Sequence, residues 1–315
     1  MQQGYASIPP LSSSEMASWS RFIQEISGVF LDQSKAYLIQ SRAGSLLRKT
    51  GSNSWSELLQ KVRYDAGGEL RNELINSITT NETSFFRDHT PFELLRNKLI
   101  PDLIDRRARE GYRRIPIRIF SAACSTGQEI YSTIITLKEL LGNLDEYDIL
   151  VTGVDISDRA VSQASSGIFS NMEVSRGLSP ERLSRFFNPT PEGYKIKDEF
   201  RFLASFRKGN LLQPMAVSSK FDIVFCRNVG IYFNQDDRHK LFQNMGLLLK
   251  DDGALIIGST ETVAAFSLDL EEMRHLRTVF YKKKTTADFN RQPSASQSTQ
   301  TNHPINYKPS LISQL

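Results

Sequence analysis

Residues 115–129 read IPIRIFSAACSTGQE, and this stretch decides the class of fold. It begins with an isoleucine-rich run and passes through a short turn of small residues, after which the pattern becomes helical. Apolar residues then recur at three- and four-residue spacing: Ile130, Ile134, Leu137 and Leu141. Gly142 follows directly, as a helix stop signal does. The stretch therefore predicts a β-strand, a tight turn and an amphipathic helix.

The same alternation continues along the chain. The segments YDILVTGVD (147–155), FDIVFCRN (221–228) and GALIIGS (253–259) are typical of strands. The segments SDRAVSQASSG (157–167) and NQDDRHKLFQNMGLLLK (234–250) are typical of helices. Strands that alternate with helices predict an α/β fold with a mainly parallel sheet covered on both faces. Right-handed crossovers then give a Rossmann-like, doubly wound sheet, whose ligand crevice lies at the carboxyl ends of the strands.

Residues 167–210 interrupt this alternation. The segment Leu178–Phe187 has the pattern of a short helix, with Ser179-Pro180 at its start. The segment GYKIKDEFRFLASFRKGN (193–210) alternates as an antiparallel hairpin does. We therefore expect a small antiparallel β-subdomain inserted into the larger domain.

The rest of the chain divides by composition. Residues 1–13 predict a disordered leader, and residues 14–90 predict an all-α domain with a linker. An amphipathic stripe in this first domain is formed by Trp19, Phe22, Ile23, Ile26 and Phe30. The α/β domain is expected over 91–284. Residues 285–315 are rich in Ser, Gln, Thr, Asn and Pro and predict a disordered tail.

Bulk composition excludes several classes of protein. The 315 residues are 39% hydrophobic and 23% charged, which is ordinary for a globular chain. We expect no transmembrane helix, because no apolar run is long enough, and no secretory signal, because the N-terminus lacks a positively charged segment followed by an apolar stretch. The two cysteines, Cys124 and Cys226, suit a reducing, cytoplasmic setting. No metal site is expected, since the four histidines and two cysteines lack metal-ligand spacing.

A basic face is expected on the second helix of the first domain, over residues 33–48. Lys35, Arg42 and Lys49 recur every seven residues and so share one side of that helix. This pattern has two interpretations, which are a solvated helix face and a docking surface for an acidic helix. Nucleic acid is not expected as a partner, because the basic residues are not interleaved with aromatic ones.

Two features at the predicted crevice point to an adenosine ligand. The small residues of the turn 122–129 let the backbone approach a ligand, although the turn does not match the GxGxxG or GK[ST] fingerprints. Asp155 ends the next strand, where a carboxylate can accept hydrogen bonds from both ribose hydroxyls. The alternative is that Asp155 only caps the helix beginning near Ser157. Asn210 is a third candidate, because its amide can read an adenine edge.

Taken together, these segments resemble the CheR chemotaxis-receptor methyltransferases over residues 19–283. The motifs that carry the resemblance are TTNETSFFR (79–87), STGQE (125–129), the strand-end Asp155 and FCRNVGIYF (225–233). The resemblance implies a domain that binds S-adenosylmethionine and releases S-adenosylhomocysteine. It also implies methyl ester formation on glutamate side chains of methyl-accepting chemotaxis proteins, for sensory adaptation. The implied partner is the cytoplasmic helical region of these receptors, and in some members the β-subdomain tethers the enzyme to them.

The resemblance also assigns roles to residues. The expected cofactor-binding residues are Asn81, Thr83, Arg87, Ala123, Glu129, Asp155, Asn210, Leu211 and Asn228. Glu129 is expected to hold the methionyl amine. Arg87 and Tyr232 are expected to be catalytic, with Arg87 orienting the attacking carboxylate, although Arg87 has an alternative role in a salt bridge to Asp88 or Glu93. The expected receptor contacts are Lys35, Arg42 and Lys49.

Three residues depart from the family pattern. Gln128 replaces a usual Glu, Ile130 replaces a usual Pro, and Gly230 replaces a bulkier residue. These departures leave two alternatives open. One is a signalling adaptor that binds S-adenosylmethionine without turnover, and the other is a methyltransferase that acts on RNA or a small molecule.

Overall fold

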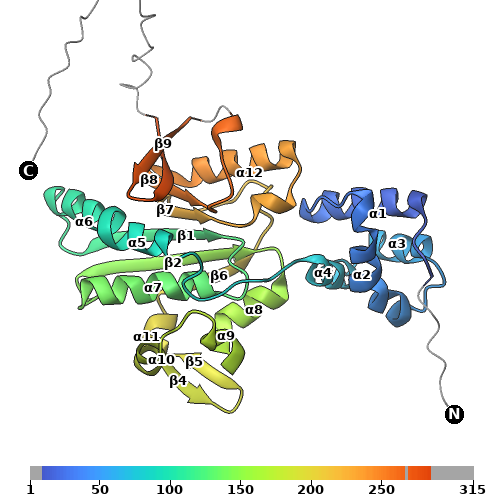
Figure 1. Ribbon diagram of the computed structural model, residues 1–315, viewed down its shortest axis with the longest axis horizontal. Helices are drawn as coiled ribbons and strands as arrows, with labels where there is room; N and C mark the ends of the chain where they lie inside the picture. Colours follow the sequence, from blue (N-terminus) through green and yellow to red (C-terminus); the bar gives the residue numbers. More distant parts are fainter. Residues whose placement is uncertain (1–8, 267–268, 285–315) are drawn as a thin grey trace, which may run out of the picture. The chain divides into compact units, whose positions relative to one another are not determined.

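A computed structural model describes residues 9–266 and 269–284 of the chain (Figure 1). The expected tail, 285–315, and most of the expected leader, 1–13, lie outside the described residues. No helix in the described ranges is long and apolar enough to cross a membrane.

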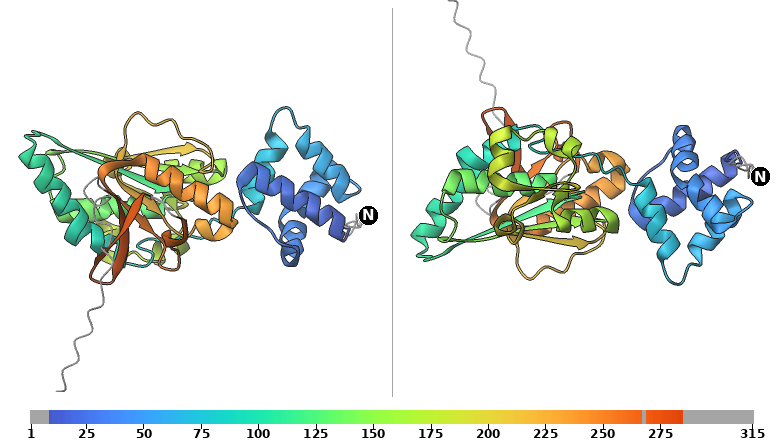
Figure 2. Two further views of the ribbon diagram at one scale, coloured as in Figure 1. Left: turned by 90° about the horizontal axis from the view of Figure 1, so that it is seen from above. Right: turned by 90° about the horizontal axis from the view of Figure 1, so that it is seen from below.

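The first domain is all helical, as the sequence predicts. Its elements are α1 (Ser13–Ser27), η1 (Gln33–Lys35), α2 (Ala36–Thr50), α3 (Trp55–Arg63) and α4 (Glu69–Ile78). Figure 2 shows these helices gathered into one bundle. Trp19 and Trp55 pack edge to face at its centre, 5.9 Å apart. The predicted stripe is buried at Trp19, Phe22 and Ile23, whereas Phe30 lies beyond the end of α1 and is 41% exposed.

The second domain is built on a seven-stranded sheet with the order β6-β2-β1-β7-β8-β10-β9. Its strands are β1 (Ile115–Ala122), β2 (Tyr147–Asp155), β6 (Ala204–Lys208), β7 (Phe221–Cys226), β8 (Leu249–Ile257), β9 (Leu270–His275) and β10 (Thr278–Lys283). The first five strands of this order pair in parallel, and β10 pairs antiparallel to β8 and β9. The strand order switches direction at β1, whose neighbours are β2 and β7, so a ligand crevice is expected at their carboxyl ends.

Helices cover both faces of this sheet. They are α5 (Thr90–Leu94), η2 (Leu95–Leu99), α6 (Ile100–Arg109), α7 (Gln128–Leu141), α8 (Asp158–Ser166) and α12 (Gln235–Leu248), with short turns η3 (Gly230–Tyr232) and η4 (Ala264–Phe266). Successive β1 side chains point to opposite faces. Ile119 packs in a core with Ile134 of α7, whereas Phe120 packs in a second core with Phe242 of α12. The predicted Rossmann-like, doubly wound fold is confirmed.

The predicted β-subdomain is also present. Its antiparallel strands are β3 (Ile168–Phe169), β4 (Phe187–Thr190) and β5 (Gly193–Ile196), and its helices are α9 (Asn171–Ser175), α10 (Pro180–Phe186) and α11 (Asp198–Arg201). Ser179 caps α10, as the Ser-Pro pair predicts.

The hairpin predicted over 193–210 is wrong. Strand β5 pairs with β3 and β4, while β6 pairs in parallel with β2 at the edge of the large sheet. Helix α11 separates the two strands, and its Phe200 is buried in the large core. Alternation predicts that a segment is a strand, but it does not identify the partner strand.

Candidate active site

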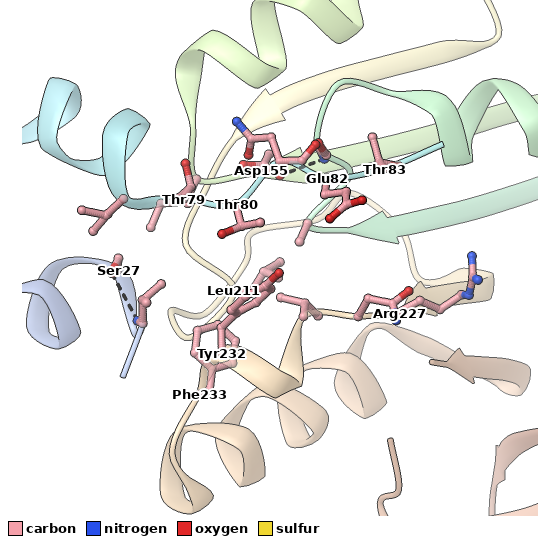
Figure 3. Close-up of a pocket in the computed structure, with 18 of the residues that line it drawn as sticks. Ser27, Thr79, Thr80, Glu82, Thr83, Asp155, Leu211, Arg227, Tyr232 and Phe233 are labelled. Carbon is pink, nitrogen blue, oxygen red and sulfur yellow. Dashed lines mark hydrogen bonds between the residues drawn. The ribbon is translucent and has the colours of Figure 1, made fainter. Parts of the chain in front are cut away.

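A solvent-open cleft lies at the carboxyl ends of β1, β2 and β7. The empty space within it, open solvent included, is about 890 Å³. Figure 3 shows Asp155 and Thr83 on one side of it, Leu211 and Tyr232 on the other, and Arg227 towards one end.

The cleft gathers most of the residues that the sequence singles out. Nine of them line it: Asn81, Thr83, Arg87, Ala123, Asp155, Asn210, Leu211, Asn228 and Tyr232. They come from five separate segments of the chain. Glu129 is not among the lining residues, and neither are Lys35, Arg42 and Lys49.

Asp155 sits at the end of β2 and links two loops. Its Oδ2 accepts a hydrogen bond from the Ser125 N–H at 2.8 Å, and its Oδ1 accepts one from the Ser157 N–H at 2.9 Å. The side-chain cap of α8 is Ser157, whose Oγ accepts from the Ala160 N–H. Burial raises the pKa of the Asp155 carboxyl, and hydrogen bonds from backbone N–H groups partly offset that rise. Both oxygens of Asp155 therefore act as hydrogen-bond acceptors at the cleft.

The turn after β1 brings backbone close to the cleft. Ala123, Ser125 and Gly127 all have positive φ, at 52°, 49° and 97°. A Cβ at Gly127 would lie 3.0 Å from the Cβ of Ala164, so a glycine lets α7 and α8 approach each other. The glycine of this turn thus serves the packing between α7 and α8.

Ile130 packs against the sheet behind this turn. Its side chain is fully buried, and a Cβ at Gly153 would lie 2.4 Å from its Cδ1. Gly153 of β2 therefore makes the space that the isoleucine fills. The isoleucine that stands here in place of the family's usual proline therefore packs in the core and does not line the cleft.

Gln128 faces away from the cleft. It is 1% exposed, and its Oε1 accepts from the Thr126 hydroxyl at 2.8 Å. Its Nε2 donates to Glu173 Oε1 of α9 at 3.5 Å. A glutamate at position 128 would set two carboxylates against each other, whereas the amide can donate. This departure concerns the contact with the β-subdomain.

The linker between the domains is held against the α/β domain. The Ser125 hydroxyl donates to the Asn81 carbonyl at 3.0 Å, and the Phe86 N–H donates to the Ser132 hydroxyl at 2.9 Å. Phe85 and Phe86 are both buried in the large core. These contacts fix the linker residues that line the cleft.

The side chain of Arg87 makes a single hydrogen bond to the described part of the chain. Its Nη1 donates to the Glu82 carbonyl at 3.2 Å. Within residues 9–266 and 269–284 it forms no salt bridge, so the alternative pairing with Asp88 or Glu93 is absent. Arg87 is half-buried at the cleft, and its guanidinium has no carboxylate partner in the described part of the chain.

Arg227 was missed by the sequence reasoning. Its side chain is only 2% exposed, and its Nη1 donates to Glu129 at 2.8 Å. Its Nη2 donates at 2.8 Å to both Asp88 and the Arg87 carbonyl. The other oxygen of Glu129 accepts from the Ser121 hydroxyl at 2.8 Å. Glu129 thus stands behind Arg227, which lines the cleft in its place.

The three basic residues predicted to share one helix face lie in η1 (Lys35) and in α2 (Arg42 and Lys49), and all three bond within the chain. Arg42 donates to the Ile78 carbonyl at 2.6 Å and to the Thr80 hydroxyl at 3.1 Å. Lys49 pairs with Glu73, and Lys35 pairs with Asp32 at 3.6 Å. Arg42 therefore supports the start of the linker.

The site geometry agrees with the comparisons to known proteins. Residues 81–279 match the family model "CheR methyltransferase, SAM binding domain", and residues 14–79 match "CheR methyltransferase, all-alpha domain". The chain belongs to the CheR methyltransferase family. It is an S-adenosylmethionine-dependent methyltransferase, and the recognition made from the motifs is confirmed.

Relatives in this family match over most of the chain. A chemotaxis protein methyltransferase of Vibrio anguillarum is 37% identical over 279 residues, covering 87% of this chain and 98% of the relative. Chemotaxis protein methyltransferase 1 of Pseudomonas aeruginosa is 38% identical over 247 residues, covering 77% and 88%. Among solved structures, a TehB-like SAM-dependent methyltransferase from Corynebacterium glutamicum has a TM-score of 0.34 at 16% identity, covering 58% and 86%.

The cleft fits the cofactor of this family. Asp155 offers a buried hydrogen-bond acceptor, and Ala123 of the turn after β1 also lines the cleft. Leu211 and Phe233 add apolar surface on the opposite side. The described residues contain no cluster of three or more His, Cys, Asp or Glu side chains placed to hold a metal ion.

Proposed function

We propose that this enzyme forms methyl esters on glutamate side chains in the cytoplasmic helical region of chemotaxis receptors. The observation that carries the site assignment is the convergence of nine assigned residues, from five segments, on one cleft. Membership of the CheR methyltransferase family supports the enzyme over an adaptor without turnover. The reaction takes place in the cytoplasm, where this region of the receptors lies.

The reaction needs no general base. S-adenosylmethionine supplies a methyl group bonded to a positively charged sulfur. One carbon–sulfur bond breaks and one carbon–oxygen bond forms, and the sulfur keeps the electron pair. A glutamate carboxylate is already ionised at neutral pH, because its unperturbed pKa is about 4.3. The chain therefore contributes orientation and exclusion of water.

The lining residues divide this work. Asp155 accepts hydrogen bonds from the ribose, and Asn210 contacts the adenine. Arg87 orients the incoming carboxylate by paired hydrogen bonds, since its guanidinium has no carboxylate partner among the described residues. Tyr232 directs its hydroxyl to the methyl end, and Glu129 holds the buried guanidinium of Arg227, which lines the cleft.

Substitution of Arg87 tests the assignment. Arg87→Ala should reduce methyl transfer from tritiated S-adenosylmethionine to receptor-bearing membranes by at least about 100-fold, while calorimetry still detects binding of S-adenosylhomocysteine. Arg113→Ala is the matched control, because Arg113 is exposed and lies away from the cleft. Full turnover by the Arg87 variant would remove Arg87 from the mechanism.

A further inference from the structure

Glu261 lies in the turn that follows β8 and reaches across to the loop that follows β7. Its Oε2 accepts hydrogen bonds from the Asn228 N–H at 2.7 Å and from the Gly258 N–H at 3.0 Å. Its Oε1 accepts from the Gly230 N–H at 2.8 Å. One carboxylate therefore satisfies three backbone N–H groups from two loops. A charged acceptor makes each of these bonds stronger than a neutral one would.

Strand register explains why these loops meet. Strands β7 and β8 are parallel neighbours, and their last residues, Cys226 and Ile257, are paired. Both loops therefore leave the sheet side by side, at the edge where the cleft lies. Glu261 closes the second loop on itself, because its own N–H donates to the Gly258 carbonyl at 3.0 Å.

The loop after β7 has a conformation that requires support. Asn228 has a φ of 56°, in the left-handed region that residues with side chains adopt only at some cost in energy. The chain then turns through η3, where the Tyr232 N–H donates to the Val229 carbonyl and the Phe233 N–H donates to the Gly230 carbonyl. Asn228 and Tyr232 both line the cofactor cleft as a result.

Two glycines leave room for the carboxylate. A Cβ at Gly258 would lie 2.4 Å from Glu261 Oε2, and a Cβ at Gly230 would lie 2.9 Å from Oε1. Gly230 is one of the departures from the family pattern, and the contact with Glu261 gives it a physical reason. Glu261 itself lines a neighbouring cavity and not the cofactor cleft.

We propose that Glu261 is the positioning residue of the methyl-transfer site. It acts through the backbone of the loop 228–230, which it holds so that Asn228 and Tyr232 point into the cleft. This inference rests on the proposed roles of those two residues. Tyr232 is proposed to be catalytic, whereas Asn228 is one of several cofactor contacts, so loss of the carboxylate should slow turnover much more than it weakens cofactor binding.

The test compares variants of the full chain. Glu261→Ala should lower kcat about 100-fold and raise the KM for S-adenosylmethionine no more than about threefold. The kcat of Glu261→Gln should lie between that of Glu261→Ala and that of the wild type. The amide oxygen of Gln can still accept hydrogen bonds from backbone N–H groups, but its NH2 group is a donor and faces an N–H that also needs an acceptor. Hydrogen exchange followed by mass spectrometry should show faster exchange confined to the two loops that the carboxylate joins, residues 226–233 and 258–261.

Gly258→Ala gives an independent variant that keeps the charge. Its added methyl group displaces the carboxylate, so kcat should fall about tenfold. Gly246→Ala in α12 is the matched control, because nothing lies within 4 Å of the added Cβ, and Glu271→Ala is the control for an exposed acid. Both controls should keep wild-type kcat.

The outcomes separate this inference from the proposed function. Failure of the wild-type chain to bind S-adenosylhomocysteine would contradict the assigned cofactor cleft. If the wild-type chain turns over and the kcat of Glu261→Ala lies within threefold of the wild-type value, the role of Glu261 is overturned but the proposed function is not. Faster hydrogen exchange spread evenly over the chain would overturn the same role. If Glu261→Ala does not fold, the kcat values of Glu261→Gln and Gly258→Ala test the role of Glu261 in its place.

Discussion

Replacing Arg227 allows a prediction with a stated magnitude, because its buried guanidinium bonds to two other segments of the chain, at Glu129 and at residues 87–88. Replacing it with Met keeps most of its volume but removes the partner of Glu129, whose side chain is 15% exposed. Breaking a buried pair from one side costs about 3–5 kcal/mol. The side chain of Asp88 is 40% exposed, so solvent screens its ion pair with Arg227, and that pair contributes little to the free energy of unfolding. We therefore expect Arg227→Met to lower the free energy of unfolding by about 3 kcal/mol.

Urea unfolding followed by circular dichroism measures this loss, and a double-mutant cycle with Glu129→Gln assigns its source. The double variant should be more stable than the sum of the two single effects predicts, because no buried charge is left without a partner. The coupling between the two sites should be at least about 1 kcal/mol. A single variant that loses less than about 1 kcal/mol, or a cycle without coupling, would refute the reasoning.

Three further predictions concern the thiols, the strand-end acid and the core. Burial raises the pKa of Cys124 and Cys226, so a thiol reagent at neutral pH should label both only after unfolding; rapid labelling of the folded chain would be inconsistent with this packing. Because burial raises the pKa of Asp155, acid should protonate it and weaken S-adenosylhomocysteine binding as the pH falls through that raised pKa. Calorimetry at a series of pH values measures this weakening, and a midpoint at or below the ordinary Asp value of about 3.9 would contradict the raised pKa. Gly153→Val should overpack the contact with Ile130 and cost about 1–3 kcal/mol in thermal unfolding, and an unchanged midpoint would contradict it.

The sequence was sufficient to predict the sheet and one side of the site. Asp155 could be placed because parallel strands end at the same edge of a sheet, so the residue that closes β2 must lie beside the turn after β1. The partner of β6 could not be predicted in this way, since alternation over 193–210 fits a hairpin and an edge strand equally well. Pairing was decided by the turn through α11 and the burial of Phe200.

Side-chain partners were harder to predict than positions. Glu129 occupies the expected first turn of α7, yet both of its oxygens are bonded to Ser121 and Arg227. The spacing of basic residues on α2 did not show that Arg42 bonds to the Ile78 carbonyl. These contacts join segments far apart in the chain, and no local pattern encodes them.

Glutamate methyl esters on chemotaxis receptors are the product that the proposed function requires. The most direct test incubates the full chain with S-adenosylmethionine and a receptor cytoplasmic helical fragment, and then maps the modified residues by mass spectrometry. We expect methyl esters on glutamate side chains, which are lost on mild base treatment and absent with Asp155→Ala. Binding of S-adenosylmethionine without an ester on any glutamate of the receptors tested would contradict it.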